Sequence, residues 1–245
     1  MVEGLLMQEE QRLVSFWSKT SGQSLMPGSG TLTAMMREHD RVRWVAAGPV
    51  VGMVLGAVDS VVNHVPIWLG EVGTARAERG GWSQVAEFVS LVLDAGWAWA
   101  ATAVLAGWLV SRRTRPAVGM LRGAVAGGVA LVFATTAYYG MDVLFDGGAW
   151  WGMATRYWLI ASVVLGPALG VAGALIRRPG LAGTLAALLV PAGAALQMVA
   201  LPPPPESLMA LPVRLTVWVS AAVATVLIIR ARGRRGFLAP SVRPN

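Results

Sequence analysis

The sequence predicts an all-α integral membrane protein, a polytopic helical bundle with six transmembrane helices. Of its 245 residues, 55% are hydrophobic and only 13% are charged, and the mean hydropathy is +0.58. Soluble domains carry about a quarter charged residues. The apolar residues also form six blocks, each of about 20 residues or more, which is the length of a membrane-crossing helix. None of the blocks alternates polar and apolar residues as a strand would.

The six blocks lie roughly at residues 44–69, 83–110, 118–140, 150–176, 180–201 and 209–230. Segments rich in helix breakers separate several of them: SRRTRP, DGG, IRRPG and PPPPE. We therefore expect one transmembrane domain over residues 44–230, an N-terminal tail of residues 1–43 and a basic C-terminal tail of residues 231–245. In the first tail, LMQEEQRLVSFW predicts a short helix and SGQSLMPGSG a linker. We assign this tail no function.

The arginines predict how the bundle lies in the membrane. Most of them precede the first block, follow the second and fourth blocks, or end the chain: Arg37, Arg41, Arg43, Arg112, Arg113, Arg115, Arg177, Arg178, Arg230, Arg232, Arg234 and Arg235. The opposite links contain only Arg76 and Arg79. Because basic residues concentrate in cytoplasmic loops, we expect a multi-pass protein of the cell membrane with both termini in the cytoplasm.

Several function classes are excluded by what the sequence lacks. The net charge of +7 does not predict nucleic-acid binding, because the arginines lie in short clusters between apolar blocks. There is no cysteine, and no nucleophile elbow, phosphate loop, zinc-binding helix or dinucleotide motif is present, so we expect no cofactor. A metal site built from Asp59, His64, Glu87 and Asp94 is chemically conceivable, but no ligand spacing supports it, so we expect none.

Acidic residues inside two consecutive blocks are the main functional signal. At about 1.5 Å of rise per residue, Asp59 lies about 15 Å and Asp94 about 18 Å below the outer ends of their spans. Such short side chains do not reach water from midspan, and an unpaired charge there costs at least about 2.5–3.5 kcal/mol. His64 and Glu87 lie nearer the outside, about 7 Å below the boundary.

Helical spacing turns these residues toward the interior of the bundle. The first block carries a stripe at steps of three and four residues: Gly48, Gly52, Gly56, Asp59 and Asn63. The second block repeats this spacing with Glu87, Ser90 and Asp94. Because glycines let another helix approach closely, we expect the two polar edges to converge inside the bundle.

We therefore predict a polar pocket in the outer half of the bundle, walled by all six helices. If the protein is an enzyme, the catalytic candidates are Asp59, Asp94 and Glu87. The candidate ligand-binding residues are Asn63, His64, Ser90, Trp97, Tyr138, Tyr139, Arg156, Trp158, Gln197 and Arg214. The two arginines of this set can neutralise two of the acids, or can reach the headgroups from near their span ends. The alternative to a functional pocket is a set of hydrogen bonds that only joins helices.

Three functions fit this pattern. The first is binding or transport of a small amphipathic or anionic molecule near the middle of the membrane. The second is an enzyme acting on a lipid-soluble, prenyl-type substrate, such as a terpene cyclase. Its buried carboxylic acid would donate a proton, and aromatic rings such as that of Trp99 would stabilise the cation. The third is an accessory or immunity subunit that contacts membrane lipid, a membrane partner or a second copy through Gly48, Gly52 and Gly56.

Three stretches resemble a family of small actinobacterial membrane proteins: SLVLDAGWAWAATAVLAGWLVSRR, YYG and LGPALGVAGALIRR. The resemblance covers roughly residues 48–200. That family has six transmembrane helices and no assigned function, so the resemblance implies a fold and assigns a role to no residue.

Overall fold

The computed structural model describes residues 29–112 and 114–237. The chain divides into two units, residues 1–43 and 44–245, and the helix packing and the site described below lie in the second unit. The short helix expected in the N-terminal tail and residues 238–245 of the C-terminal tail lie outside the described residues. The first helix already begins at Ser29, within the predicted tail.

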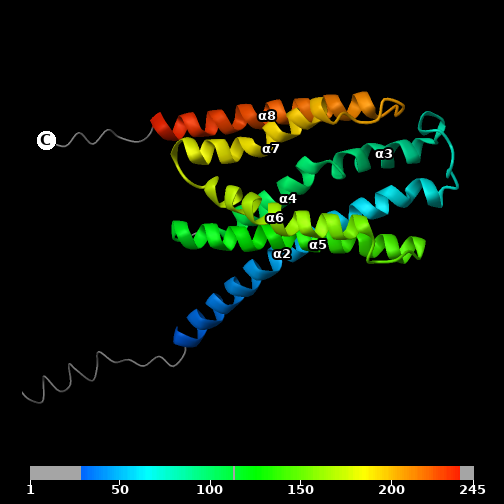
Figure 1. The fold of residues 1–245 in the computed structure, drawn as a ribbon. Coiled ribbons are helices and arrows are strands. Elements are labelled where there is room, and N and C mark those ends of the chain that lie inside the picture. Colours follow the sequence, from blue (N-terminus) through cyan, green and yellow to red (C-terminus); the bar gives the residue numbers. More distant parts are fainter. Residues whose placement is uncertain (1–28, 113, 238–245) are drawn as a thin grey trace, which may run out of the picture. The chain divides into compact units, whose positions relative to one another are not determined.

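Every regular element that the structure describes is helical, which confirms the all-α prediction. In chain order the elements are α2 (Ser29–Trp68), η1 (Arg76–Glu78), α3 (Gly81–Leu93), α4 (Gly96–Val110), α5 (Pro116–Asp146), α6 (Met153–Leu175), α7 (Gly180–Ala200) and α8 (Ala210–Phe237) (Figure 1). Five helices are long and apolar enough to cross a membrane, and α3 with α4 makes a sixth crossing if the bent pair is one span. These helices are those of a membrane protein.

The second predicted span is broken, which corrects the expectation of one continuous helix over residues 83–110. The chain bends by 58° between α3 and α4, because Asp94 ends α3 and Ala95 has an extended backbone with ψ of 132°. The side chain of Gln197 stabilises the new helix start, since its Oε1 accepts the backbone N–H of Trp97 at 3.0 Å. This bond satisfies a donor in the first turn of α4 that has no partner within its helix.

The third predicted span, residues 118–140, continues to Asp146 as part of α5. Pro116 occupies its first turn, and Gly147, with φ of 70°, ends it in the left-handed conformation that glycine adopts readily. The longer helix therefore also carries Asp142 and Asp146, which we had placed after the span.

Glycines bring the backbones of α2, α4, α5 and α6 close together, and we call these four helices the glycine-packed region. A methyl group added at Gly52 or Gly56 would collide with the backbone of Ala130 or Ala134 on α5. Gly127 of α5 lies equally close to Gly166 and Gly170 of α6. The stripe of Gly48, Gly52 and Gly56 is therefore covered by α5 of the same chain, and the structure does not leave it free for a second copy as we had proposed.

The remaining long helices, α7 and α8, pack by larger side chains. Figure 1 shows them side by side, and their core consists of Ala194, Met198, Val213 and Val217. Trp97 and Trp218 pack against this core. Trp97, which we predicted to bind ligand, therefore lies against the α7–α8 core.

Candidate functional site

Polar side chains of α2, α3 and α5 form one group, which we call the carboxylate cluster. Its members are Asp59, Ser60, Asn63, His64, Ser90, Asp94, Tyr138, Asp142 and Asp146. The amide of Asn63 donates to the carboxylate of Asp94 and to the hydroxyl oxygen of Tyr138, at 3.1 Å in each case. Ser90 Oγ donates to Asn63 Oδ1 at 2.5 Å. The polar edges of the first two predicted spans therefore converge, as their helical spacing predicted.

Asp59 is the most enclosed member of this cluster. Its exposed fraction is 0%, and neither carboxyl oxygen has a hydrogen-bond partner among the described residues. Its neighbours are the carboxyl groups of Asp94 and Asp142 and the indole of Trp99. No basic side chain forms an ion pair with Asp59 in the part of the chain that the structure describes. Such a buried carboxyl group is costly as an anion unless a cation lies beside it.

Two aspartates that the sequence analysis missed extend the cluster to the surface. Ser60 Oγ donates to Asp142 Oδ1 at 2.6 Å. The ring of His64 is buried, with Nδ1 2.7 Å from the Ser60 carbonyl oxygen and 4.0 Å from Asp142 Oδ1. Its Nε2 lies 3.3 Å from Asp146 Oδ2, and the Asp146 side chain is 57% exposed. The spacing of Tyr138, Asp142 and Asp146, four residues apart on one helix face, is the signal that would have found them.

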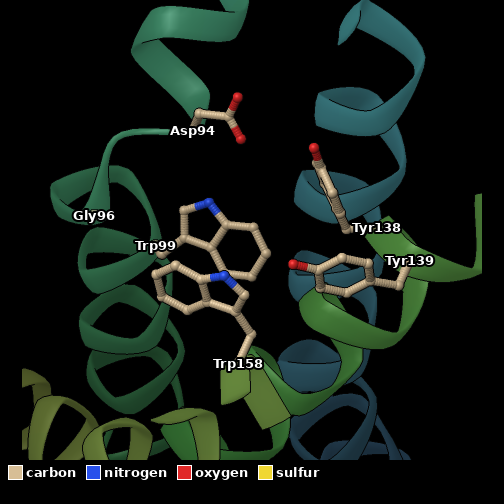
Figure 2. A pocket seen from close by; sticks show the side chains of 6 residues that line it. All are labelled: Asp94, Gly96, Trp99, Tyr138, Tyr139 and Trp158. Carbon is tan, nitrogen blue, oxygen red and sulfur yellow. The ribbon is translucent and has the colours of Figure 1, made fainter. Parts of the chain in front are cut away.

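A cavity of about 170 Å³ adjoins the cluster. Its lining comes from the α3–α4 break, α4, α5 and α6: Asp94, Gly96, Trp99, Tyr138, Tyr139 and Trp158. Figure 2 shows the rings of Trp99 and Trp158 on one side, the two tyrosines on the other and the Asp94 carboxylate at one end. The tryptophan rings are stacked with centroids 6.3 Å apart. No residue of α7 or α8 lines this pocket, so our expectation of a pocket walled by all six helices is wrong.

Glu87 does not line the pocket but forms an ion pair with an arginine outside it. Its carboxylate is nearly buried and accepts a hydrogen bond from Arg76 at 2.9 Å. Arg76 lies in η1, in the link between α2 and α3. The partner of Glu87 is thus an arginine of the neighbouring link, and neither Arg156 nor Arg214, which we had considered as partners for the acids.

Three further predicted ligand-binding residues have other contacts. Arg156 lies over the ring of Trp151, 5.7 Å from its centroid, and Arg214 lies over Trp218 at 5.1 Å. Gln197 binds the backbone of α4, as described above. None of the three lines the pocket.

The chemistry of the site is therefore that of carboxyl groups beside aromatic ring faces. The described residues contain no cluster of three or more side chains suited to a metal ion. Comparison of the chain with family models, curated proteins and solved structures finds no match. The resemblance to the actinobacterial family remains a prediction.

Proposed function

We propose that this chain is a multi-pass protein of the cell membrane that binds a small organic cation in the aromatic pocket and carries it across the membrane. In this proposal both termini lie in the cytoplasm, as the arginine distribution predicts. The observation that carries the proposal is the pocket lining, which combines four aromatic rings with a carboxyl group and, among the described residues, includes no basic side chain.

Charge favours a cation over the anionic ligand that the sequence had left open. The faces of tryptophan and tyrosine rings attract ammonium groups, and the attraction strengthens where water is excluded. Asp94 supplies a carboxylate at the pocket, and Asp59 and Asp142 add two carboxyl groups close behind it. The arginines that would have bound an anion, Arg156 and Arg214, contact tryptophan rings outside the pocket.

The size of the pocket limits the ligand. Its volume is about 170 Å³, close to the engineered cavity of about 150 Å³ that holds benzene. Pockets that enclose drug-sized ligands measure about 300–1,000 Å³. The pocket therefore suits a methylated ammonium or guanidinium group, and is small for a long prenyl chain.

Exchange with protons supplies the transport step. An ionised Asp59 without a cation nearby is costly, so the cluster holds a proton when the pocket is empty and releases it when a cation binds beside Asp94. Asp142 and the exposed Asp146 lie on either side of His64, 4.0 Å and 3.3 Å from its ring nitrogens, and these carboxylates offer the released proton acceptors between the cluster and the surface. One cation then enters for each proton that leaves the cluster.

Choline and its uncharged analogue 3,3-dimethyl-1-butanol test the proposal, because the two have the same shape and differ in charge. We expect the purified full chain in detergent to bind choline and to bind the alcohol at least about tenfold more weakly, as measured by calorimetry. Choline affinity should fall as the pH is lowered, because protons compete for the carboxylates. In proteoliposomes, a protonophore should abolish choline uptake driven by a pH gradient.

Asp94→Asn is the decisive variant. We expect it to weaken choline binding by about tenfold to 100-fold, since a bond to a charged group contributes about 1.5–3 kcal/mol. Asp146→Asn, an equal charge change at an exposed position, serves as the matched control and should keep binding while slowing transport. Equal affinity for choline and the alcohol, or wild-type choline affinity in Asp94→Asn, would contradict the proposal.

A second candidate is acid-initiated chemistry on a small alkene. It rests on the Asp59 carboxyl group, which has no hydrogen-bond partner among the described residues and lies beside Trp99. A protonated Asp59 could donate its proton to a double bond, and the ring faces would stabilise the carbocation formed. The Asp59 carboxylate would then take a proton from a neighbouring carbon, which gives an isomeric alkene and restores the acid. Dimethylallyl alcohol incubated with the detergent-purified protein tests it: product that needs no gradient and disappears in Asp59→Asn favours the enzyme.

A further inference from the structure

A second cavity, of about 300 Å³, lies at the end of the bundle where α4, α6 and α8 end and α7 begins. Figure 1 shows the start of α7 and the red end of α8 together there. Two arginines line the cavity, Arg177 two residues after the end of α6 and Arg232 near the end of α8. The ring of Trp108, from α4, forms part of its wall.

Positive charges are concentrated around this wall. The guanidinium of Arg177 lies 4.4 Å from the centre of the Trp108 ring, and that of Arg112 lies 4.7 Å from the same centre. Partial burial, and secondly the charge of Arg112, lower the pKa of Arg177. Two like charges thus share one tryptophan, an arrangement that costs free energy unless an anion accompanies them.

The described part of the chain supplies no such anion. None of Arg112, Arg177 and Arg232 forms an ion pair with a carboxylate there. From residue 95 to residue 141 the sequence contains no acidic residue, and Glu206 is the only one after Asp146. Glu206 lies in the link between α7 and α8, at the opposite end of both helices.

Arg232 gives the cavity a fixed basic wall. Its guanidinium donates to the carbonyl oxygens of Arg178 at 2.7 Å and Gly183 at 3.0 Å, and also to that of Ile176. These bonds tie α8 to the end of α6 and the start of α7. They hold the cation in place without neutralising its charge, because carbonyl groups are dipoles.

The other walls are apolar and belong to membrane-spanning segments. Ala187 of α7 and Ile228 of α8 lie inside the spans Gly180–Ala200 and Ala210–Arg234. The cavity therefore combines guanidinium groups at the membrane boundary with an apolar surface that continues into the bilayer. Arginine binds phosphate oxygens through paired N–H groups, and basic pockets between transmembrane helices bind anionic lipid headgroups.

We propose that this cavity binds the phosphodiester headgroup of an anionic phospholipid, with Arg177 of its lining at the phosphate and an acyl chain along Ile228. The charge of Arg112, which lies over the Trp108 ring of the cavity wall, adds to the attraction. The site is separate from the aromatic pocket, so the two proposals stand or fall independently.

The test uses the full chain in nanodiscs of phosphatidylcholine, with or without phosphatidylglycerol. We expect phosphatidylglycerol to raise Tm by about 5 °C or more, as expected for a ligand present far above its dissociation constant. Arg177→Gln combined with Arg112→Gln should remove most of this shift, whereas Arg177→Lys should keep part of it, because lysine binds phosphate as a point charge. Arg115→Gln is the control for Arg177→Gln alone, because each removes one charge. Arg115 lies at the start of α5, outside the cavity, so its variant should keep the full shift, whereas Arg177→Gln should lose part of it.

Two outcomes overturn the proposal. The first is an equal Tm shift in Arg177→Gln and in Arg115→Gln, which would mean general attraction between basic loops and anionic membrane. The second is a full shift produced by dissolved glycerol 1-phosphate in phosphatidylcholine nanodiscs, which would identify a soluble phosphate ester as the ligand. Choline binding by the double variant should equal that of the wild type whatever the lipid result.

Discussion

The apolar helices pack by backbone contact in the glycine-packed region and by larger side chains in the α7–α8 pair. In the first, glycines let backbones touch, as Gly56 does against α5 and Gly127 against α6. In the second, Met198, Val213 and Val217 fill the space between helices. Helices α2 and α5 of the first region supply seven of the nine members of the carboxylate cluster, whereas the core of the second region is apolar.

The close backbone packing explains why the candidate site lies beside the glycine-packed helices. Aspartate, serine and asparagine have short side chains, which meet across a helix pair only if the backbones are close. Ser60 reaches Asp142 on α5, four residues beyond the glycine stripe of α2, and Thr135 of α5 lies 2.9 Å from Ser162 of α6. Close packing thus gives buried polar groups their partners, which lowers the cost of placing them in a membrane.

Of the variants considered, Gly56→Leu should destabilise the protein most. The new side chain would meet the backbone of α5 at Ala134, and we expect a loss of more than about 4 kcal/mol or failure to fold. Gly193→Leu is the matched control in α7, where an added Cβ meets nothing within 4 Å. It should be neutral or slightly stabilising, because leucine favours a helix over glycine by about 1 kcal/mol. Thermal unfolding in detergent measures both, and equal losses would show that close backbone packing does not distinguish the regions.

A pair of tryptophan variants should separate binding from packing. Trp99→Leu removes one ring face from the pocket, so we expect choline affinity to fall by about 30-fold, from about 2 kcal/mol of lost cation–π attraction. Trp218→Leu removes a ring that packs on the α7–α8 core and whose Nε1 donates to the Ala195 carbonyl oxygen at 3.3 Å. It should lower Tm and leave choline affinity unchanged. The opposite pattern would place the ligand against α8.

Gln197→Met should have the smallest effect, because it removes one bond between the two regions. The Trp97 N–H at the start of α4 would lose its acceptor, and we expect a loss of about 1 kcal/mol, or about 2–4 °C in Tm. Leu196→Met, a neighbouring substitution at an exposed position, is the control. No difference between the two variants would mean that the bend at Ala95 does not depend on Gln197.

The sequence alone predicts the helices and six of the nine members of the carboxylate cluster; Ser60, Asp142 and Asp146 are the three that it does not single out. The apolar blocks predicted where the long helices lie, because the free energy of inserting a segment into lipid depends mainly on its own side chains. The three-four spacing of Asp59 and Asn63 predicted an inward face, since that spacing is a property of one helix. Asp142 and Asp146 were missed because an acidic residue at the end of an apolar run reads as the end of a span. Their helix continues to Asp146, and Ser60 and His64 of α2 contact them there.

The apolar helices, their inward polar edges and the arginine-rich links can all be predicted from the amino-acid sequence, because each is a property of a single segment. Which polar edges meet depends on how the helices pack. In the folded chain α5 covers the glycine stripe, Glu87 forms an ion pair with Arg76, and Gln197 caps the start of α4. These outcomes depend on contacts between segments far apart in the chain, whose energies arise only once the helices lie side by side.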